Sequence, residues 1–146
     1  KLTTPLAAGT YTNTAFISAT ADLIAENNTA FINFTVPNVA PTFDTAPVNT
    51  ATQNTPYIYT AIAKDDNGDV LTITAPTLPF WLTLTDHGNG TATLFGTPSS
   101  ADVGDHIVVL YVTDAGGLSE TQSFTITVVR APNISIFLPL VFGNGQ

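Results

Sequence analysis

The sequence contains no cysteine and no methionine, and only 10% of its 146 residues are charged. Without cysteine the chain can form no disulfide, no thiolate metal site and no thiol nucleophile. Three cationic side chains stand against eleven acidic ones, for a net charge of −8. Such a surface repels phosphate backbones and anionic headgroups, so we expect no nucleic-acid partner. No apolar run reaches the roughly 18 residues of a spanning helix, so we expect no membrane insertion.

Hydrophobic residues are abundant, at 44% of the chain. A chain this apolar can bury a core and is not expected to be disordered. Its short alternating runs are rich in Thr, Val and Ile, which favour strands, and Pro, Gly and Asn mark turns between them. The crossover helices of an α/β fold are missing, so the sequence predicts an all-β fold.

Two strands are predicted near the N-terminus, over residues 10–20 and 29–36. The second has an apolar face formed by Ala30, Ile32, Phe34 and Val36. Two strands alone are not stable in water, so we expect this segment to pair with something else. The proline-flanked residues 37–41 then predict a short, stiff linker.

A longer series of strands is predicted beyond the linker. Their ranges are 55–64, 70–75, one starting at 79, 91–95, 106–113 and 121–129. About seven strands in about 90 residues, with turns every 8–12 residues, are typical of a β-sandwich.

An ordered series of motifs runs through residues 40–130. These motifs are Ala40-Pro41-Thr42-Phe43, Thr55-Pro56-Tyr57-Ile58-Tyr59, Ala63-Lys64-Asp65-Asp66-Asn67-Gly68-Asp69, Trp81-Leu82, Gly96-Thr97-Pro98, Ala101-Asp102-Val103-Gly104, Val112-Thr113-Asp114 and Phe124-Thr125-Ile126-Thr127-Val128. In order and spacing they resemble the dystroglycan-type cadherin-like repeats, also called putative immunoglobulin domains, of bacterial surface proteins. The resemblance implies an immunoglobulin- or cadherin-like β-sandwich that works outside a cell.

A second resemblance concerns residues 9–36. Tyr11-Thr12-Asn13-Thr14-Ala15 and Asn27-Asn28-Thr29-Ala30 are similar to the C-terminal half of another surface-protein repeat. The first strands of that repeat have no counterpart in this sequence. The predicted segments are a partial β-sandwich at 1–36, the linker at 37–41, the sandwich at 42–130 and an apolar C-terminal strand at 131–146.

Five acidic or amide side chains are candidate calcium ligands. Ca²⁺ takes six to eight oxygen ligands, and closely spaced Asp and Asn residues on one turn can supply several. The candidates are Asp65, Asn67, Asp69, Asp102 and Asp114, the last two only if their loops lie at the same end. The resembled repeats read Asp-Pro-Asp-Gly-Asp at this turn, and cadherins add ligands from a linker where this chain offers the poor ligands Asn38 and Val39. A solvated turn without an ion stays open as the alternative.

The remaining polar and aromatic residues form no catalytic pattern. His87 and His106 are too few, and no nucleophile elbow, phosphate loop or dinucleotide motif occurs, so the sequence predicts no enzyme. Trp81 and Phe80 could stack on a carbohydrate, but the position of Trp81 favours core packing. Carbohydrate binding is therefore a possibility that no pattern in the sequence supports.

The C-terminal stretch is apolar on both strand faces. Its candidate assembly residues are Ile134, Ile136, Leu138, Leu140 and Phe142. Ordering such a strand costs about 1–2 kcal/mol per residue, so it needs a partner. It folds back on its own chain, or it completes the N-terminal segment of a neighbour by strand addition, which head to tail generates filaments. The sequence thus predicts a self-associating extracellular filament or surface-layer subunit. The alternative is a spacer or adhesion module of a larger secreted surface protein that binds carbohydrate or protein.

Overall fold

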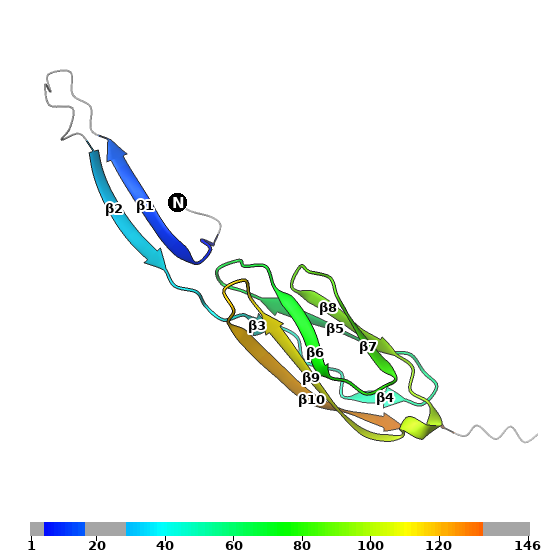
Figure 1. The fold of residues 1–146 in the computed structure, drawn as a ribbon. Helices are drawn as coiled ribbons and strands as arrows, with labels where there is room; N and C mark the ends of the chain where they lie inside the picture. Colours follow the sequence, from blue (N-terminus) through cyan, green and yellow to red (C-terminus); the bar gives the residue numbers. More distant parts are fainter. Residues whose placement is uncertain (1–4, 17–28, 133–146) are drawn as a thin grey trace, which may run out of the picture.

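The protein consists of two regions set end to end (Figure 1). The structure is a computed structural model, and it describes residues 5–16 and 29–132. One region is a two-stranded hairpin, β1–β2, and the other is a body of two four-stranded sheets, β3–β10, called the sandwich below. The last strand, β10, ends at the pole far from the hairpin. Within the described ranges no helix is long and apolar enough to cross a membrane.

The hairpin is antiparallel and pairs in unbroken register. It consists of β1 (Gly9–Phe16) and β2 (Thr29–Val36), so the second predicted strand is confirmed at both ends. Residues 17–20 of the first predicted strand lie outside the described residues. Tyr11 lies opposite Phe34, and their stacked rings have centroids 5.5 Å apart.

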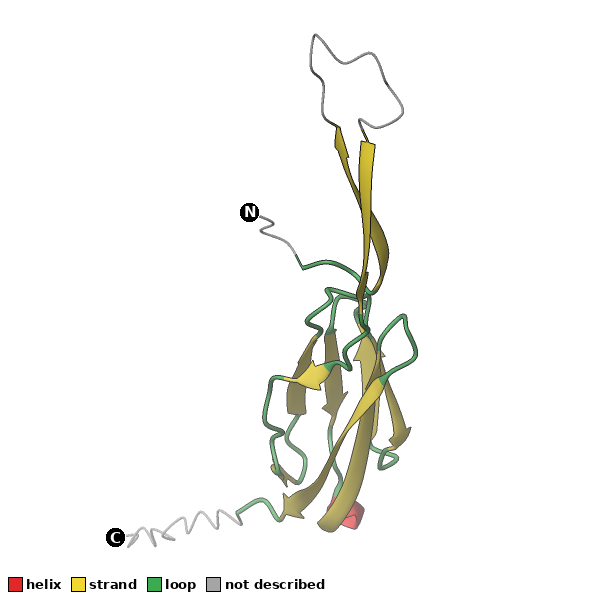
Figure 2. Ribbon diagram, turned by 90° about the vertical axis from the view of Figure 1, so that its left-hand side faces the viewer, coloured by secondary structure: helices red, strands yellow, loops and turns green. Residues whose placement is uncertain are grey.

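The sandwich has two layers, one with strand order β4-β10-β9-β6 and one with order β3-β5-β8-β7 (Figure 2). The strand bounds are β3 (Thr42–Phe43), β4 (Thr50–Thr52), β5 (Tyr57–Lys64), β6 (Thr72–Thr77), β7 (Leu82–Asp86), β8 (Thr91–Gly96), β9 (Gly104–Thr113) and β10 (Ser119–Val129). Neighbouring strands are antiparallel, except that β4 runs parallel to β10. The all-β fold and the sandwich class predicted from the sequence are confirmed.

Two details of the strand prediction were incomplete. The first strand of the sandwich is divided into β3 and β4, which are two and three residues long and join different sheets. Segments this short leave no alternation to detect in the sequence. In addition, β6 runs on to Thr77 through Pro76, where its pairing with β9 shifts register. Proline cannot donate to a ladder, and a bulge is one of the places in a sheet that tolerate it.

The core lies between the two sheets. On β5 every second side chain is buried, and these side chains are Tyr57, Tyr59, Ala61 and Ala63. The opposite sheet contributes fully buried residues, namely Val108, Leu110, Val112 and Ile126. Trp81 packs at the margin of this core, edge-on to Tyr57 with ring centroids 5.8 Å apart, so the prediction of core packing for Trp81 is confirmed. Its neighbour Phe80 is fully exposed.

Candidate metal site at the hairpin junction

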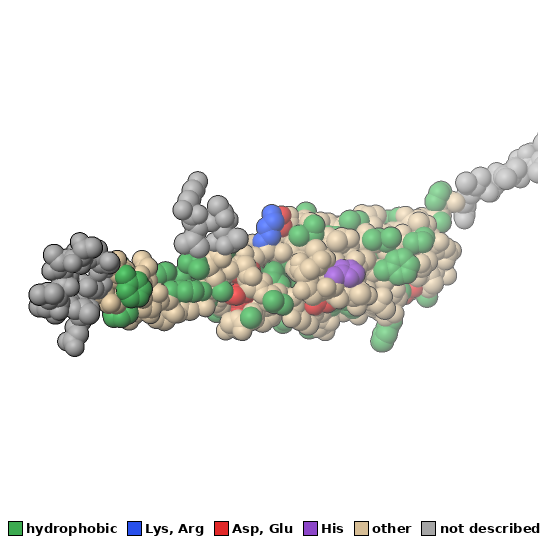
Figure 3. All heavy atoms as spheres, turned by 90° about the horizontal axis from the view of Figure 1, so that it is seen from above, with side chains coloured by type: hydrophobic (Ala, Val, Ile, Leu, Met, Phe, Trp, Pro, Cys, Tyr) green, Lys and Arg blue, Asp and Glu red, His purple; other side chains and the backbone are tan. Residues whose placement is uncertain are grey.

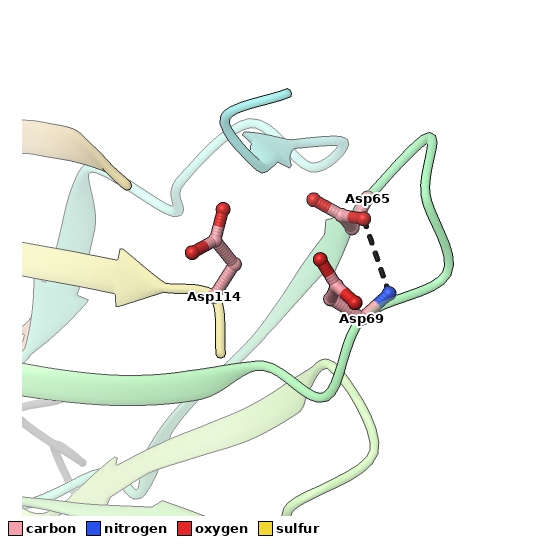
Figure 4. A group of neighbouring side chains, drawn as sticks. All are labelled: Asp65, Asp69 and Asp114. Atoms are coloured by element: carbon pink, nitrogen blue, oxygen red, sulfur yellow. Dashed lines mark hydrogen bonds between the residues drawn. The ribbon is translucent and has the colours of Figure 1, made fainter. Parts of the chain in front are cut away.

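Three carboxylates converge where the hairpin meets the sandwich (Figure 4). One oxygen of each of Asp65, Asp69 and Asp114 lies within 4.8 Å of the others. Asp65 follows β5, Asp69 lies in the loop before β6, and Asp114 follows β9, so three separate strands position them. Like charges this close repel each other, and a divalent cation is the group that offsets such repulsion.

The acidic turn, Asp65–Asp69, is built by its own first side chain. Oδ1 of Asp65 accepts hydrogen bonds from the backbone amides of Asn67, at 2.8 Å, and Asp69, at 3.1 Å. The backbone amide of Gly68 donates to the carbonyl of Asp65 at 3.1 Å, and Gly68 has φ +75°, which favours glycine. Asp and Gly occur in such turns because they supply these contacts and this conformation. The turn therefore holds the carboxylates of Asp65 and Asp69 on one side.

Asp114 is nearly completely buried, with 6% of its surface exposed. Its Oδ1 accepts from the backbone amide of Leu118 at 2.8 Å, which closes the turn between β9 and β10. Its Oδ2 accepts from the side-chain amide of Asn38 at 2.9 Å. A buried carboxylate is costly unless it is paired or bonded to a metal, and the contacts of Asp114 include no cationic side chain among the described residues. Asp114 is therefore the most deeply buried carboxylate of the site.

Two buried oxygens at this junction have no hydrogen-bond partner within the described part of the chain. They are Oδ1 of Asn38 and Oδ2 of Asp65. Unpaired buried polar atoms are rare and need an explanation. A bound ion is one such explanation. Amide and carboxylate oxygens are also the ligands that Ca²⁺ prefers. The residues present therefore fit a calcium site in which the linker, residues 37–41, contributes Asn38. The sequence alone predicts Asn38 to be a poor ligand.

The structure brings together three of the five residues predicted as ligands. Asn67 belongs to the same turn, but its side chain is engaged by the linker and the chain before β1. Asp102 lies at the opposite pole, because it precedes β9 whereas Asp114 follows it. A ten-residue strand spans about 30 Å. Asp102 is therefore not a member of this site, and the condition that its loop lies at the same end is not met.

Asp102 has a different part in the fold. It closes a single turn of 3-10 helix, Ser100–Asp102, and accepts hydrogen bonds from the backbone amide of Ser99 at 2.8 Å and its hydroxyl at 2.7 Å. These bonds hold the pKa of Asp102 below its usual value. The carbonyl of Asp102 contacts Nε2 of His106 at 2.7 Å. The arrangement is a cap that fixes the loop before β9.

A small pocket opens beside the acidic turn. Its volume is about 310 Å³, and it lies between the acidic turn and the β7–β8 turn, which contributes Gly88, Asn89 and Gly90. Gly90 has φ +77°, and a Cβ there would lie 2.8 Å from the carbonyl oxygen of Ala63. The two histidines lie elsewhere: His87 contacts Thr93, and the ring of His106 lies edge-on to Trp81. Neither histidine contacts a carboxylate side chain or lines this pocket within the described structure.

The second candidate surface is the hairpin. Phe16, Phe31 and Ile32 are 79%, 69% and 63% exposed, respectively. The register places Tyr11, Phe34 and Ile32 on one face, and β1 and β2 pair only with each other in the described structure. Figure 3 shows hydrophobic side chains gathered on the hairpin. The predicted assembly residues Ile134, Ile136, Leu138, Leu140 and Phe142 lie outside the described residues.

Comparisons with known proteins agree with this architecture. A family model described as "Putative Ig domain" matches residues 35–129. The endo-fucoidan hydrolase MfFcnA4 from glycoside hydrolase family 107 is similar to this chain, with a TM-score of 0.53 and 27% identity over 71% of this chain and 17% of the hydrolase. The SrpA adhesin from Streptococcus sanguinis is similar with a TM-score of 0.53 and 15% identity, over 65% of this chain and 59% of the adhesin. No curated protein matches.

Proposed function

The chain belongs to the putative Ig domain family, and from that premise we propose that it is a non-catalytic structural module of a larger extracellular surface protein. One observation carries the proposal. The chain enters the sandwich from the hairpin at one pole and leaves β10 at the other, so neighbouring segments are held apart along one axis (Figure 1). The similarity to part of an adhesin and to part of an endo-fucoidan hydrolase supports a module that recurs in larger proteins.

Calcium at the junction is the second element of the proposal. The cation would be held by the carboxylates of Asp65, Asp69 and Asp114, with Asn38 from the linker. These groups come from both sides of the boundary between hairpin and sandwich, so bound Ca²⁺ would stiffen that boundary. The 4.8 Å spread of the carboxylate oxygens and the two unpartnered oxygens support this assignment.

Calorimetric titration tests the calcium site. We expect the wild type to release or absorb heat with Ca²⁺, and Asp65→Asn to lose that signal. Asp66→Asn is the matched control, because it removes the same charge from the same turn at an exposed position outside the cluster. Equal calcium affinity in the wild type and both variants would refute the site, whereas loss in Asp65→Asn alone would support it.

A second candidate function is self-assembly by β-strand complementation. The specific observation is the exposed apolar face of the hairpin. A two-stranded sheet with such a face is not stable in water by itself. A strand with an apolar residue at every second position fits such a face, and residues 134–142, which are apolar on both strand faces, meet that condition. A donor from a second copy would extend the hairpin and, repeated head to tail, would build a filament at the cell surface.

Size-exclusion chromatography and negative-stain imaging of the full chain distinguish the two functions. Long polymers that disappear on deletion of residues 133–146 would support assembly, and a monomer would support the spacer. Ile32→Asp should block assembly, because it places a charge on the apolar face of the hairpin. Thr35→Asp is the control on the other face, where it should leave polymers intact. Polymers that survive the deletion would reject strand donation.

A further inference from the structure

Asn67 occupies a place that neither the calcium site nor the core explains. Its side chain is nearly inaccessible, with 6% of its surface exposed, although it belongs to a turn of charged and polar residues. Oδ1 of Asn67 accepts a hydrogen bond from the backbone amide of Val39 at 2.8 Å. Its Nδ2 donates to the carbonyl of Pro37 and to the carbonyl of Leu6, both at 3.3 Å. All three partners of this side chain are backbone groups at the base of the hairpin.

The three contacts involve both chain segments at the base of the hairpin. Leu6 precedes β1, whereas Pro37 and Val39 follow β2. A single side chain of the sandwich therefore bonds to the segment that enters the hairpin and to the segment that leaves it. Two anchored segments restrict rotation far more than one, because a single point of attachment leaves the hairpin free to swing about it. The hairpin is thereby fixed in direction as well as in position.

The chemistry requires an amide at this position. An aspartate could accept from the amide of Val39, but it has no donor for the carbonyls of Leu6 and Pro37. It would also place a charged oxygen beside two carbonyl oxygens in a site where Asn67 is buried, which is unfavourable without a compensating partner. Alanine would lose all three bonds. Buried hydrogen bonds of this kind depend on no ion.

A neighbouring contact holds the same linker to a second turn of the sandwich. The side chain of Asn38 donates to Asp114 at 2.9 Å, and a Cβ on Gly116 would lie 2.2 Å from Nδ2 of Asn38. Glycine at 116 therefore leaves the space that the side chain of Asn38 occupies beside Asp114. Successive linker groups thus contact two different turns of the sandwich, the acidic turn and the turn after β9.

We propose that Asn67 is an amide latch that fixes the hairpin to the sandwich without a cation. The latch is independent of the proposed calcium site, since its three bonds use only protein groups. Calcium would add to the stiffness of a junction that is already closed. The hairpin therefore keeps its direction in calcium-free medium, which a junction held by the ion alone would not do.

Distance measurements between two spin labels test the latch in the full chain. The sequence has no cysteine, so cysteines introduced at exposed Thr35 on β2 and exposed Thr125 on β10 would be the only labelling sites. With a chelator present, we expect a narrow distance distribution in the wild type and a broad one in Asn67→Asp and Asn67→Ala. Asn89→Asp is the matched control: Asn89 also precedes a glycine in a turn at this pole, and its contacts to Thr91 use only Oδ1, which aspartate retains.

The outcomes separate the latch from the calcium site. A distribution that stays narrow in Asn67→Asp, or that broadens equally in Asn89→Asp, would overturn the latch. A wild type that is broad in chelator and narrow only with Ca²⁺ would overturn it too, while supporting the calcium brace. A broad Asn67→Asp with no effect of Ca²⁺ on any variant would uphold the latch and reject the brace. If the substitutions prevent folding, the wild type in chelator still tests the latch, because a broad distribution there would overturn it.

Discussion

The hairpin and the sandwich are made of the same kind of strand, but only one of them buries it. Both β2 and β5 have an apolar residue at every second position, from Ala30 to Val36 in β2 and from Tyr57 to Ala63 in β5. In β5 every second residue is buried, whereas no residue of β2 is. The difference is the second sheet, which covers β5 and has no counterpart over β2 in the described structure. Alternation thus specifies a strand, and burial depends on what faces it.

This difference also divides the stability of the chain. Apolar area removed from water stabilises a fold by about 25 cal/mol per Å², and the sandwich contains the buried apolar side chains. The hairpin contributes backbone hydrogen bonds and the stacked pair of Tyr11 and Phe34, with its other large apolar groups in water. We therefore expect the two regions to respond very differently to the same change.

The largest expected contrast comes from removing one apolar side chain in each region. Leu110→Ala should lower the free energy of unfolding by about 2–5 kcal/mol, because Leu110 is fully buried and its loss leaves a cavity. Phe31→Ala should change it by no more than about 0.5 kcal/mol, because the ring is exposed. Urea unfolding followed by the fluorescence of Trp81 measures both. Comparable losses would mean that the face of the hairpin that carries Phe31 is covered in solution.

Calcium should stabilise the junction by a smaller amount. At a free Ca²⁺ concentration 100 times the Kd, the stabilisation is about 2.7 kcal/mol if only the folded state binds. Melting temperatures with Ca²⁺ and with a chelator measure this increment. Asp114→Asn should abolish it, and Asp102→Asn, at the far pole, should retain it. An increment that survives Asp114→Asn would place the calcium elsewhere.

A methyl group on Gly116 should loosen the junction between the two regions without unfolding either region. Its Cβ would displace the side chain of Asn38 from Asp114, which removes one hydrogen bond worth about 0.5–1.5 kcal/mol. We expect Gly116→Ala to speed hydrogen exchange at the base of the hairpin while the sandwich melts nearly as before. Ser119→Ala, at an exposed position after the same turn, is the control. A large drop in the melting temperature would show that the junction belongs to the core.

A last contrast should appear only at alkaline pH. Burial, with a further contribution from the neighbouring Tyr59, raises the pKa of Tyr57 from 10.0 to about 12. The fold thus favours the neutral phenol, and this contribution is present below pH 10 and is lost as the pH rises through about 12. Tyr57→Phe should weaken the alkaline loss of sandwich stability. Tyr11→Phe, on the hairpin, should leave it unchanged, and melting curves across this range measure both.

The sequence was sufficient for the parts of the fold that are periodic. The strands β5, β9 and β10 were predicted because each is eight to eleven residues long and rich in β-branched or aromatic residues. The edge strands β3 and β4 were missed because their pairing depends on the neighbouring strands and not on their own residues. Side chains that act through local contacts, such as those of the acidic turn, were likewise visible as candidates.

The candidate site could be predicted only in part, because it depends on which loops share a pole. Asp114 and Asp102 flank the same strand, and their sequence context gave no reason to include one and omit the other. The part played by Asn38 and the bonds of Asn67 depend on the path of the linker over the sandwich, which no pattern in the chain specifies. The sequence indicated the residue types of the candidate site, and only the fold shows which of these residues lie together.

The parallel pairing of β4 with β10 has a mechanical consequence. Thr50–Thr52 come early in the sequence of the sandwich and pair with Thr127–Val129, which come last. Flanking backbone bonds run from Thr127 to Asn49 and from Gln53 to Val129. A pull on the hairpin and on the end of β10 acts along these two strands in opposite directions. Their hydrogen bonds then bear the load together, in shear, and cannot be opened one at a time. The module is built to carry tension along its long axis.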